Sequence, residues 1–171
     1  MLSCPTSQAF QLIERSILDI FTSEPFLSEC RRLQGEASCL ICLRKENYVW
    51  WLSVGDCMLF LSHAELARWG QAMLNQRNFY EWIGRVNTFE LSVPCYSSGR
   101  RQLRSGTSEI IMITDGFLDT GYGLNGIADV LQGRINMNKF FEMLHNESTV
   151  DSTTMIYWSV VNPKSAAIPS N

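Results

Sequence analysis

Three aspartates in this sequence stand where a carboxylate could be held rigidly enough to take part in chemistry. Asp115 directly follows the apolar run 110–114, and Asp151 stands just before a second run, 153–161, that is rich in β-branched and aromatic residues. Asp56 lies in a short turn between two further apolar runs. Each aspartate alone is explained at least as well by a turn residue that hydrogen-bonds to nearby backbone. Their shared placement at strand ends is what suggests a site.

The pair Asp115 and Asp151 carries the most specific prediction. If the runs 109–114 and 153–161 form neighbouring antiparallel strands, both side chains lie at the same end of one sheet. Two carboxylates about 4 Å apart repel by roughly 4 kcal/mol at an effective dielectric constant of about 20. Such a pair needs a shared proton or a divalent cation, and all-oxygen ligands favour the hard ions Mg²⁺ and Mn²⁺.

The elements that would hold these residues follow from hydrophobic periodicity and from turn residues. Helical spacing of apolar residues predicts helices, and apolar runs bounded by turn residues predict strands. The short connections between the first three strands predict that these strands pair antiparallel. The predicted helices cover 10–21, 27–33, 65–74, 127–131 and 137–144, and the predicted strands cover 37–43, 48–54, 57–61, 89–93, 109–114 and 153–161.

Two motifs compete with the aspartates for a chemical role. Cys39 and Cys42 form a CxxC, but they lie in a predicted strand, where residues three apart point to opposite faces, and the sequence holds no second CxxC. The segment 121–126 reads GxGxxG, but residues 115–120 separate it from the preceding strand, whereas a dinucleotide-binding fold places it directly after one. We therefore interpret the cysteines as core packing in a reducing compartment and the glycine segment as a flexible loop.

Charge and composition exclude several classes of partner. The net charge of −3 argues against a general nucleic-acid binder. The basic residues Arg100, Arg101 and Arg104 lie beside a turn, which favours a solvated hairpin end, with phosphate capture as the minority alternative. No apolar run approaches the roughly 18 residues of a membrane helix, and the first ten residues lack the Lys or Arg of a secretory leader. The expectation is a soluble, cytoplasmic protein without a nucleic-acid or membrane partner.

The order of these pieces resembles the PPM-type metal-dependent serine/threonine phosphatases, the protein phosphatase 2C family. The segment 54–57, Val-Gly-Asp-Cys, is similar to the family's Val-Gly-Asp-Ser. The segment 110–119, Ile-Ile-Met-Ile-Thr-Asp-Gly-Phe-Leu-Asp, resembles a hydrophobic strand ending in Ser-Asp-Gly-x-x-Asp. The segment 151–156 resembles the Asp-Asn/Asp-x-Thr opening of the family's last strand, and 35–38 stands where the family has Gly-Ser/Thr-Thr-Ala. The resemblance spans residues 35–161.

The resemblance implies an α+β fold, namely an antiparallel β-sandwich flanked by helices (α/β/β/α), with two Mn²⁺ or Mg²⁺ ions at one end. It implies that Asp115 and Asp151 are direct metal ligands and that Asp56 holds metal-bound water or a further, weaker ion. It also implies hydrolysis of phosphoserine or phosphothreonine by a metal-activated water, with no catalytic side chain of another kind. The segment 65–82 falls where family members carry the flap beside the active site.

Several positions depart from the family pattern. The family's bridging metal ligand lies in an Asp-Gly motif after an early strand, and nothing upstream of Gly35 matches it, because the upstream acids lie in predicted helices or turns. Cys57, Met58 and Ser152 replace the usual Ser, Arg and Asn or Asp. Without the bridging ligand, metal affinity is expected to be poor. Residues 1–161 are therefore predicted to form a partial PPM-type domain that lacks its N-terminal strands, followed by a flexible tail at 162–171.

Two functions remain open at this point. One is a metal-dependent protein serine/threonine phosphatase that acts on a phosphoprotein and is incomplete for catalysis on its own. The other is a catalytically inactive PPM-fold module that regulates a partner, such as a phosphoprotein or a serine/threonine kinase. Sheets without their first strands expose apolar edges, so either self-association through such an edge or an unusually exposed apolar patch is also expected.

Overall fold

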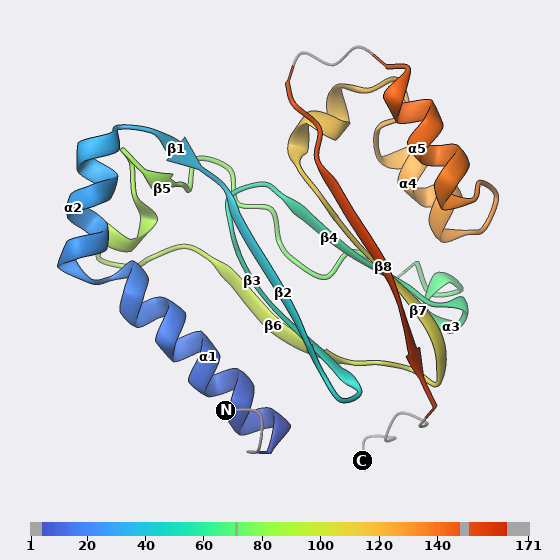
Figure 1. Ribbon diagram of the computed structural model, residues 1–171, viewed down its shortest axis with the longest axis horizontal. Coiled ribbons are helices and arrows are strands. Elements are labelled where there is room, and N and C mark those ends of the chain that lie inside the picture. The colour runs from blue at the N-terminus through green and yellow to red at the C-terminus, as the bar shows by residue number, and fades with distance from the viewer. Residues whose placement is uncertain (1–4, 71, 148–150, 164–171) are drawn as a thin grey trace. The chain divides into compact units, whose positions relative to one another are not determined.

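The computed structural model describes residues 5–70, 72–147 and 151–163. The chain divides into two compact units, one built from the residues up to 57 together with 75–103, and the other from 58–74 together with the residues from 104 onward. Each unit contains an antiparallel sheet with helices beside it (Figure 1). The α+β class predicted from the sequence is confirmed.

The first unit is a three-stranded sheet with two N-terminal helices and a short accessory ladder. The sheet order is β2-β3-β6 and both pairs are antiparallel, while the short strands β1 and β5 pair with each other. Its elements are α1 (Thr6–Phe21), α2 (Glu24–Leu33), β1 (Glu36–Ala37), β2 (Cys39–Lys45), β3 (Tyr48–Val54), β5 (Ile83–Gly84), the 3₁₀ helix η1 (Thr88–Glu90) and β6 (Ser97–Gln102).

Strand β3 is the centre of this unit. Every residue from Val49 to Val54 is buried, as expected for a strand that is covered on both faces. Phe10 of α1 stacks on Trp50 with ring centroids 6.3 Å apart. The Trp50 indole N–H and the Ser98 hydroxyl donate to the Glu14 carboxylate at 3.4 and 2.7 Å. Helix α1 is therefore held on the sheet by apolar packing and by one shared acceptor.

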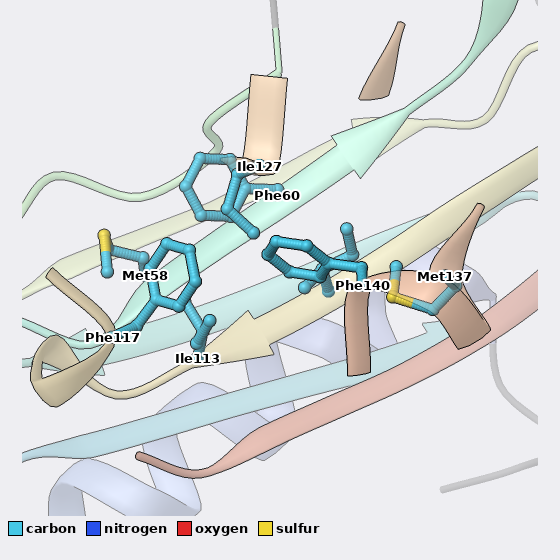
Figure 2. Packing of buried hydrophobic residues seen from close by; sticks show 8 residues of the cluster. Met58, Phe60, Ile113, Phe117, Ile127, Met137 and Phe140 are labelled. Atoms are coloured by element: carbon cyan, nitrogen blue, oxygen red, sulfur yellow. The ribbon is translucent and has the colours of Figure 1, made fainter. Parts of the chain in front are cut away.

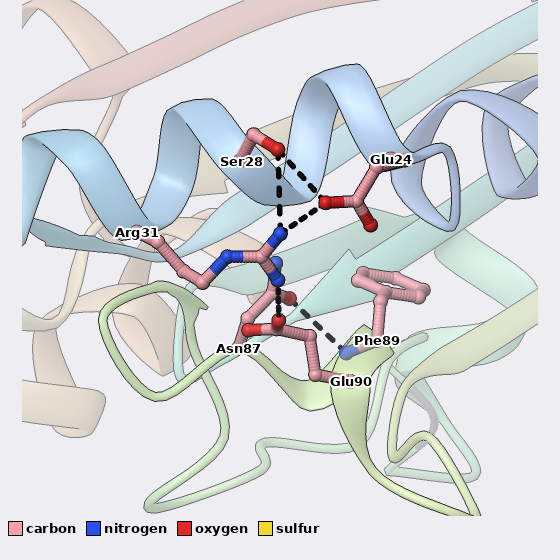
Figure 3. A network of polar contacts seen from close by, with 6 residues as sticks. All are labelled: Glu24, Ser28, Arg31, Asn87, Phe89 and Glu90. Carbon is pink, nitrogen blue, oxygen red and sulfur yellow. Dashed lines mark hydrogen bonds and ion pairs between the residues drawn. The ribbon is translucent and has the colours of Figure 1, made fainter.

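A polar network joins α2 to η1 (Figure 3). The Arg31 guanidinium pairs with both Glu24 and Glu90, and it also donates to the Ser28 hydroxyl at 3.3 Å. These groups are largely exposed, so the network contributes little to stability. The Arg31–Glu90 pair links α2 to the last residue of η1.

The second unit is a three-stranded sheet with two helices packed on it. Strand β7 lies between β4 and β8 and is antiparallel to both, so that its residue Ile113 is opposite Met58 on one side and Met155 on the other. The elements are β4 (Met58–Ser62), α3 (Ala64–Ala67), β7 (Gly106–Ile113), the 3₁₀ helix η2 (Asp115–Asp119), α4 (Gly123–Leu131), α5 (Met137–His145) and β8 (Met155–Asn162).

Aromatic and aliphatic side chains of strands β4 and β7 pack against those of η2, α4 and α5 to form the core of this unit (Figure 2). Phe117 of η2 and Phe140 of α5 are fully buried and meet edge to face, with centroids 5.7 Å apart and an interplanar angle of 61°. This core holds η2, and with it the chain directly after β7, against the sheet. Its buried members are Met58, Phe60, Ile111, Ile113, Phe117, Ile127, Met137 and Phe140.

The helix predicted at 65–74 is wrong beyond its first turn. Helix α3 ends at Ala67, and Gly70 takes a positive φ of 63° that turns the chain back. The segment then pairs with β4, because the Leu61 amide donates to Ala72 O and the Leu74 amide donates to Leu59 O, each at 2.8 Å. Backbone pairing with a buried strand overrides the local helical spacing. No helix in the described ranges has both the length and the apolar character needed to cross a membrane.

The strand predicted at 89–93 is also wrong, since the structure has the 3₁₀ helix η1 there. The Asn87 side chain accepts from the Phe89 amide at 3.1 Å, and the Thr88 hydroxyl accepts from the Cys95 amide at 2.7 Å. These local bonds replace strand pairing. The strand that the sequence did not reveal is β6, whose residues Ser-Ser-Gly-Arg-Arg-Gln pair with β3.

The three successive strands predicted to pair with one another do so only in part. Strands β2 and β3 form the expected antiparallel hairpin, with Ile41 opposite Leu52. Strand β4 instead joins the other sheet and pairs with β7, so that Leu61 is opposite Ile110. The turn at Gly55 and Asp56 therefore connects two sheets rather than two neighbouring strands.

Strand β8 lies at an edge of its sheet within the described chain. The segment Met155–Asn162 has no charged residue and no proline, and Ile156 and Val161 are 53% and 63% exposed. Asn162 is the last residue of β8, so the strand runs one residue into the predicted tail. The Asn162 side-chain nitrogen donates to Arg104 O at 3.2 Å. Residues 164–171 of that tail lie outside the described residues.

Natural edge strands are usually protected by charges or proline, and we therefore expect concentration-dependent self-association through β8. Replacing Ile156 with Lys adds a charge to this strand and should shift the chain toward monomer, whereas Ile156→Val should not. Sedimentation velocity over a dilution series measures both. A wild-type chain that stays monomeric throughout, or equal association of the Lys and Val variants, contradicts the prediction.

Candidate functional site

The structure places Asp115 and Asp151 at the same end of one sheet, as predicted. Asp115 begins η2, two residues after Ile113 ends β7, and Asp151 stands four residues before Met155 begins β8. Ile113 and Met155 are opposite each other in the ladder. Asp115 is half-buried and Asp151 is exposed, so both can be reached by a ligand from solvent.

Thr114 joins the two segments that carry these carboxylates. Its amide donates to Thr154 O at 3.0 Å, and its hydroxyl accepts from the Thr154 amide at 2.9 Å and donates to Ser152 O at 3.2 Å. The hydroxyl thus continues the β7–β8 ladder past the end of β7. Sequence patterns singled out Asp115 and its glycine but missed Thr114 as the residue that positions the pair.

Gly116 allows the two segments to approach closely. A Cβ atom at this position would lie 2.7 Å from Ser152 O and 3.1 Å from Asp151 O, both of which are backbone atoms. No real side chain tolerates the shorter contact without a shift of the backbone. The glycine is therefore required here by close packing, and it brings the backbone carbonyls of 151 and 152 beside the Asp115 turn.

Asp56 belongs to the first unit and is buried there. Its carboxylate accepts from the Ser38 hydroxyl at 2.8 Å. Gly55 has a φ of +88°, and a Cβ on it would lie 2.5 Å from Ser38 Oγ, so this turn also requires glycine. Along the chain, Asp56 precedes β4 by two residues, and the first residue of β4, Met58, pairs with Ile113.

The donors present suit a hard cation but not a complete two-ion centre. Asp115 and Asp151 supply carboxylate oxygens, which Mg²⁺ and Mn²⁺ prefer. Mg²⁺ is commonly held by one or two carboxylates with water completing its shell. Across the described residues, however, three or more His, Cys, Asp or Glu side chains nowhere come together as a metal site. The carboxylates at this sheet end in the described chain are therefore too few for a two-ion centre.

The acids upstream of Gly35 are engaged on helices. Glu14 in α1 accepts from Trp50 and Ser98. Glu24 and Glu29 in α2 form ion pairs with Arg31 and Arg32, and the hydrogen bond from Arg32 lowers the pKa of Glu29. Asp19 lies in α1 as well. None of these positions follows a strand, as the family's Asp-Gly motif does.

The two competing motifs serve packing. Burial raises the pKa of Cys42 to about 12 and also raises that of Cys39, so neither thiol is ionised near neutral pH. The predicted loop at 121–126 is wrong, because α4 begins within it at Gly123. A Cβ on Gly126 would lie 2.9 Å from the ring of Phe140, so this glycine lets α4 and α5 pack closely.

Comparison with known proteins identifies the fold. No protein-family model matches the sequence, and no curated protein matches it. Solved structures do match. The chain superposes on a serine/threonine phosphatase of S. agalactiae with a TM-score of 0.61 at 14% identity, covering 89% of this chain and 72% of that one.

Two further solved structures agree. The catalytic domain of the serine/threonine protein phosphatase PstP, in complex with two manganese ions, gives a TM-score of 0.50 at 13% identity, covering 80% of this chain and 66% of that one. PppA of Pseudomonas aeruginosa, a regulatory component of the type VI secretion system, gives 0.52 at 12% identity, covering 81% and 73%. The chain therefore has the fold of the PPM-type serine/threonine phosphatases. The resemblance inferred from short sequence motifs is confirmed at the level of the fold.

We expect the Thr114 hydroxyl to be needed for the geometry of this site. The substitution Thr114→Val removes a donor and an acceptor and should lower the free energy of unfolding by about 1–2 kcal/mol. The matched variant Thr114→Ser keeps the hydroxyl and should cost less than about 1 kcal/mol. Urea denaturation measures both, and equal losses for the two variants would show that the methyl group, not the hydroxyl, matters.

Proposed function

We propose that this chain is a relative of the protein serine/threonine phosphatases in which Asp115 and Asp151 bind one Mn²⁺ or Mg²⁺ ion. The observation that carries the proposal is the Thr114 clamp, which ties the two carboxylate-bearing segments together at one end of the β4-β7-β8 sheet. The fold supports it, because solved structures of this fold are serine/threonine phosphatases. PstP itself was solved with two manganese ions.

The substrate class would be a phosphoserine or phosphothreonine side chain of a protein. A bound divalent cation supplies electrostatic stabilisation of a phosphoryl group and activates water for attack. Within this chain, Asp115 and Asp151 would hold the cation, and the backbone around Gly116 would fix their separation. Asp56 would orient water or a further, weaker ion.

We further propose that the chain alone does not complete this reaction. A two-ion mechanism uses a carboxylate that bridges both ions, and in the described residues the acids upstream of Gly35 are committed to helices α1 and α2. One ion without the bridge leaves the attacking water poorly positioned. Catalysis would then require a further carboxylate from outside the described residues.

The second candidate is a regulatory module of the same fold that binds a phosphoprotein or a serine/threonine kinase without hydrolysis. The incomplete set of acidic ligands favours it. The two candidates differ in what a supplied carboxylate would do. Addition of a segment that carries an Asp-Gly motif should confer hydrolysis in the first case and have no effect in the second.

The purified chain should bind Mn²⁺ yet show little or no hydrolysis of a generic phosphate ester in millimolar Mn²⁺. Asp115→Asn and Asp151→Asn should each weaken Mn²⁺ binding by about tenfold or more, because loss of a direct ligand exceeds the loss caused by an outer-shell residue. Isothermal titration calorimetry and a chromogenic ester assay measure the two quantities. Asp129→Asn is the control, because Asp129 lies on α4 and its carboxylate pairs with Arg134.

Robust turnover that Asp115→Asn abolishes would contradict the proposal that the chain alone does not complete the reaction. It would mean that another acid supplies the bridge. Unchanged Mn²⁺ affinity in both Asp115→Asn and Asp151→Asn, with the fold intact, would contradict the cation site itself.

A further inference from the structure

A cavity of about 340 Å³, which we call the α5 cavity, lies in the second unit beside the C-terminal end of α5. Its walls come from α5, from the residue that follows η2 and from the residues that lead into β8. Phe141, Leu144 and Met155 supply its apolar lining, and Phe141 is exposed. Clefts of about 300–1,000 Å³ are typical of small-molecule sites. The α5 cavity is therefore large enough for one amino-acid side chain.

Glu147 brings a negative charge to this cavity. It is half-buried, and the Gly121 amide donates to its Oε2 at 3.3 Å, which holds the carboxylate beside the chain that follows η2. No Lys, Arg or His within the described ranges forms an ion pair with Glu147, whereas Glu65 and Asp129 each have an arginine partner. Helix α5 ends at His145, and the C-terminal end of a helix carries partial negative charge. The α5 cavity therefore favours a cation.

Three other cavities of the described chain differ in their charge, because each is lined by a lysine or arginine as well as by an acid. These pairs are Arg100 with Glu46, Arg15 with Glu14, and Lys139 with Glu142. Among its described lining residues the α5 cavity has an acid but no lysine or arginine. The charge of Glu147 is therefore available to a ligand.

We propose that the α5 cavity binds a lysine or arginine side chain of the phosphoprotein, about three residues from the phosphorylated residue. The inference rests on the proposed function, because it names a sequence preference for the substrate. Lys and Arg have an apolar stem and a charged head. Leu144 and Met155 would contact the stem, and the Glu147 carboxylate would accept from the head. Phe141 adds an aromatic ring, whose face attracts cations.

The spacing follows from the position of the cavity along the two segments that carry the candidate cation ligands. Thr120 directly follows η2, which begins at Asp115, and Thr153 stands two residues after Asp151. A 3₁₀ helix rises about 2 Å per residue, so the five steps from Asp115 to Thr120 span at most roughly 10 Å. An extended peptide covers this distance in about three residues. A phosphate at Asp115 and Asp151 would thus leave a side chain at that spacing within reach of the cavity.

The test uses the full chain in EDTA, so that neither a bound cation nor hydrolysis contributes. Fluorescent peptides with one phosphoserine are titrated with protein and followed by polarisation. They carry one Arg three residues before or after the phosphoserine, or Gln at the same positions. Because His145 also lines the cavity, the buffer is at pH 8, where an imidazole in water is uncharged. One of the Arg peptides should bind about fivefold or more tightly than its Gln counterpart.

A pair of variants assigns this preference to the cavity. Glu147→Gln keeps a carbonyl oxygen that can accept from the Gly121 amide, so it should remove the preference for Arg and leave the affinity of the Gln peptide unchanged. Glu142→Gln makes the same charge change at an exposed residue of α5 outside the α5 cavity. It should alter the preference less than about twofold.

A second measurement needs neither a variant nor a phosphate. In ¹H–¹³C spectra of the wild-type chain, arginine amide should shift the methyl signals of Leu144, Thr153 and Met155 and leave those of Leu12 on α1 in place. Equal binding of the Arg and Gln peptides, or equal effects of Glu147→Gln and Glu142→Gln, would overturn the proposal. A preference for Arg that is the same with and without the phosphate would contradict the proposed function and leave the basic side-chain site standing.

Discussion

Pairing of β7 along both of its edges is the interaction on which the candidate site depends. Its apolar residues are buried, so its backbone groups must bond within the sheet, and β4 and β8 supply those partners. This pairing fixes where β7 ends and where β8 begins. The Thr114 hydroxyl adds two further bonds to the segment before β8. These bonds place Asp115 and Asp151 at the same end of the sheet. A shift of the β8 register by one residue would turn each of its side chains to the opposite face of the sheet. It would also move Asp151 away from Asp115.

The number of carboxylates at this sheet end limits how many cations the proposed site can hold. Two sheet-end carboxylates can neutralise one divalent cation, and their mutual repulsion is relieved by it. A second cation needs a further negative ligand placed between the two ions. In this chain the residues that precede Gly35 form helices whose acids accept from Trp50 and Ser98 or pair with arginines. Glu14, Glu24 and Glu29 are thus engaged with other groups of the first unit.

The sequence predicted the elements whose pattern is strong and local. The buried run before Asp115, the strand after Asp151 and helix α1 were all predicted correctly, because long apolar runs and helical spacing leave few alternatives. Strand β6 was missed because its six residues are mostly polar and include two arginines and a glycine. It forms a strand because it pairs with the buried strand β3. The helix predicted at 65–74 failed because the partner of its second half, β4, is set by tertiary structure.

The candidate site shows the same division. Asp115 and Asp151 could be placed at one sheet end from strand order alone, and the structure agrees. The role of Thr114 could not be predicted, because it depends on a backbone atom contributed by a distant segment.

The most direct test of the cation site is paramagnetic broadening of backbone amide signals by Mn²⁺ added in substoichiometric steps. The amides of Asp115, Gly116 and Ser152 should broaden first, and Asp115→Asn should abolish that selectivity. Signals of α1 and of Arg85 should remain sharp at the same Mn²⁺ concentration. Broadening that begins elsewhere, or that survives Asp115→Asn unchanged, would contradict a cation held between the ends of β7 and β8.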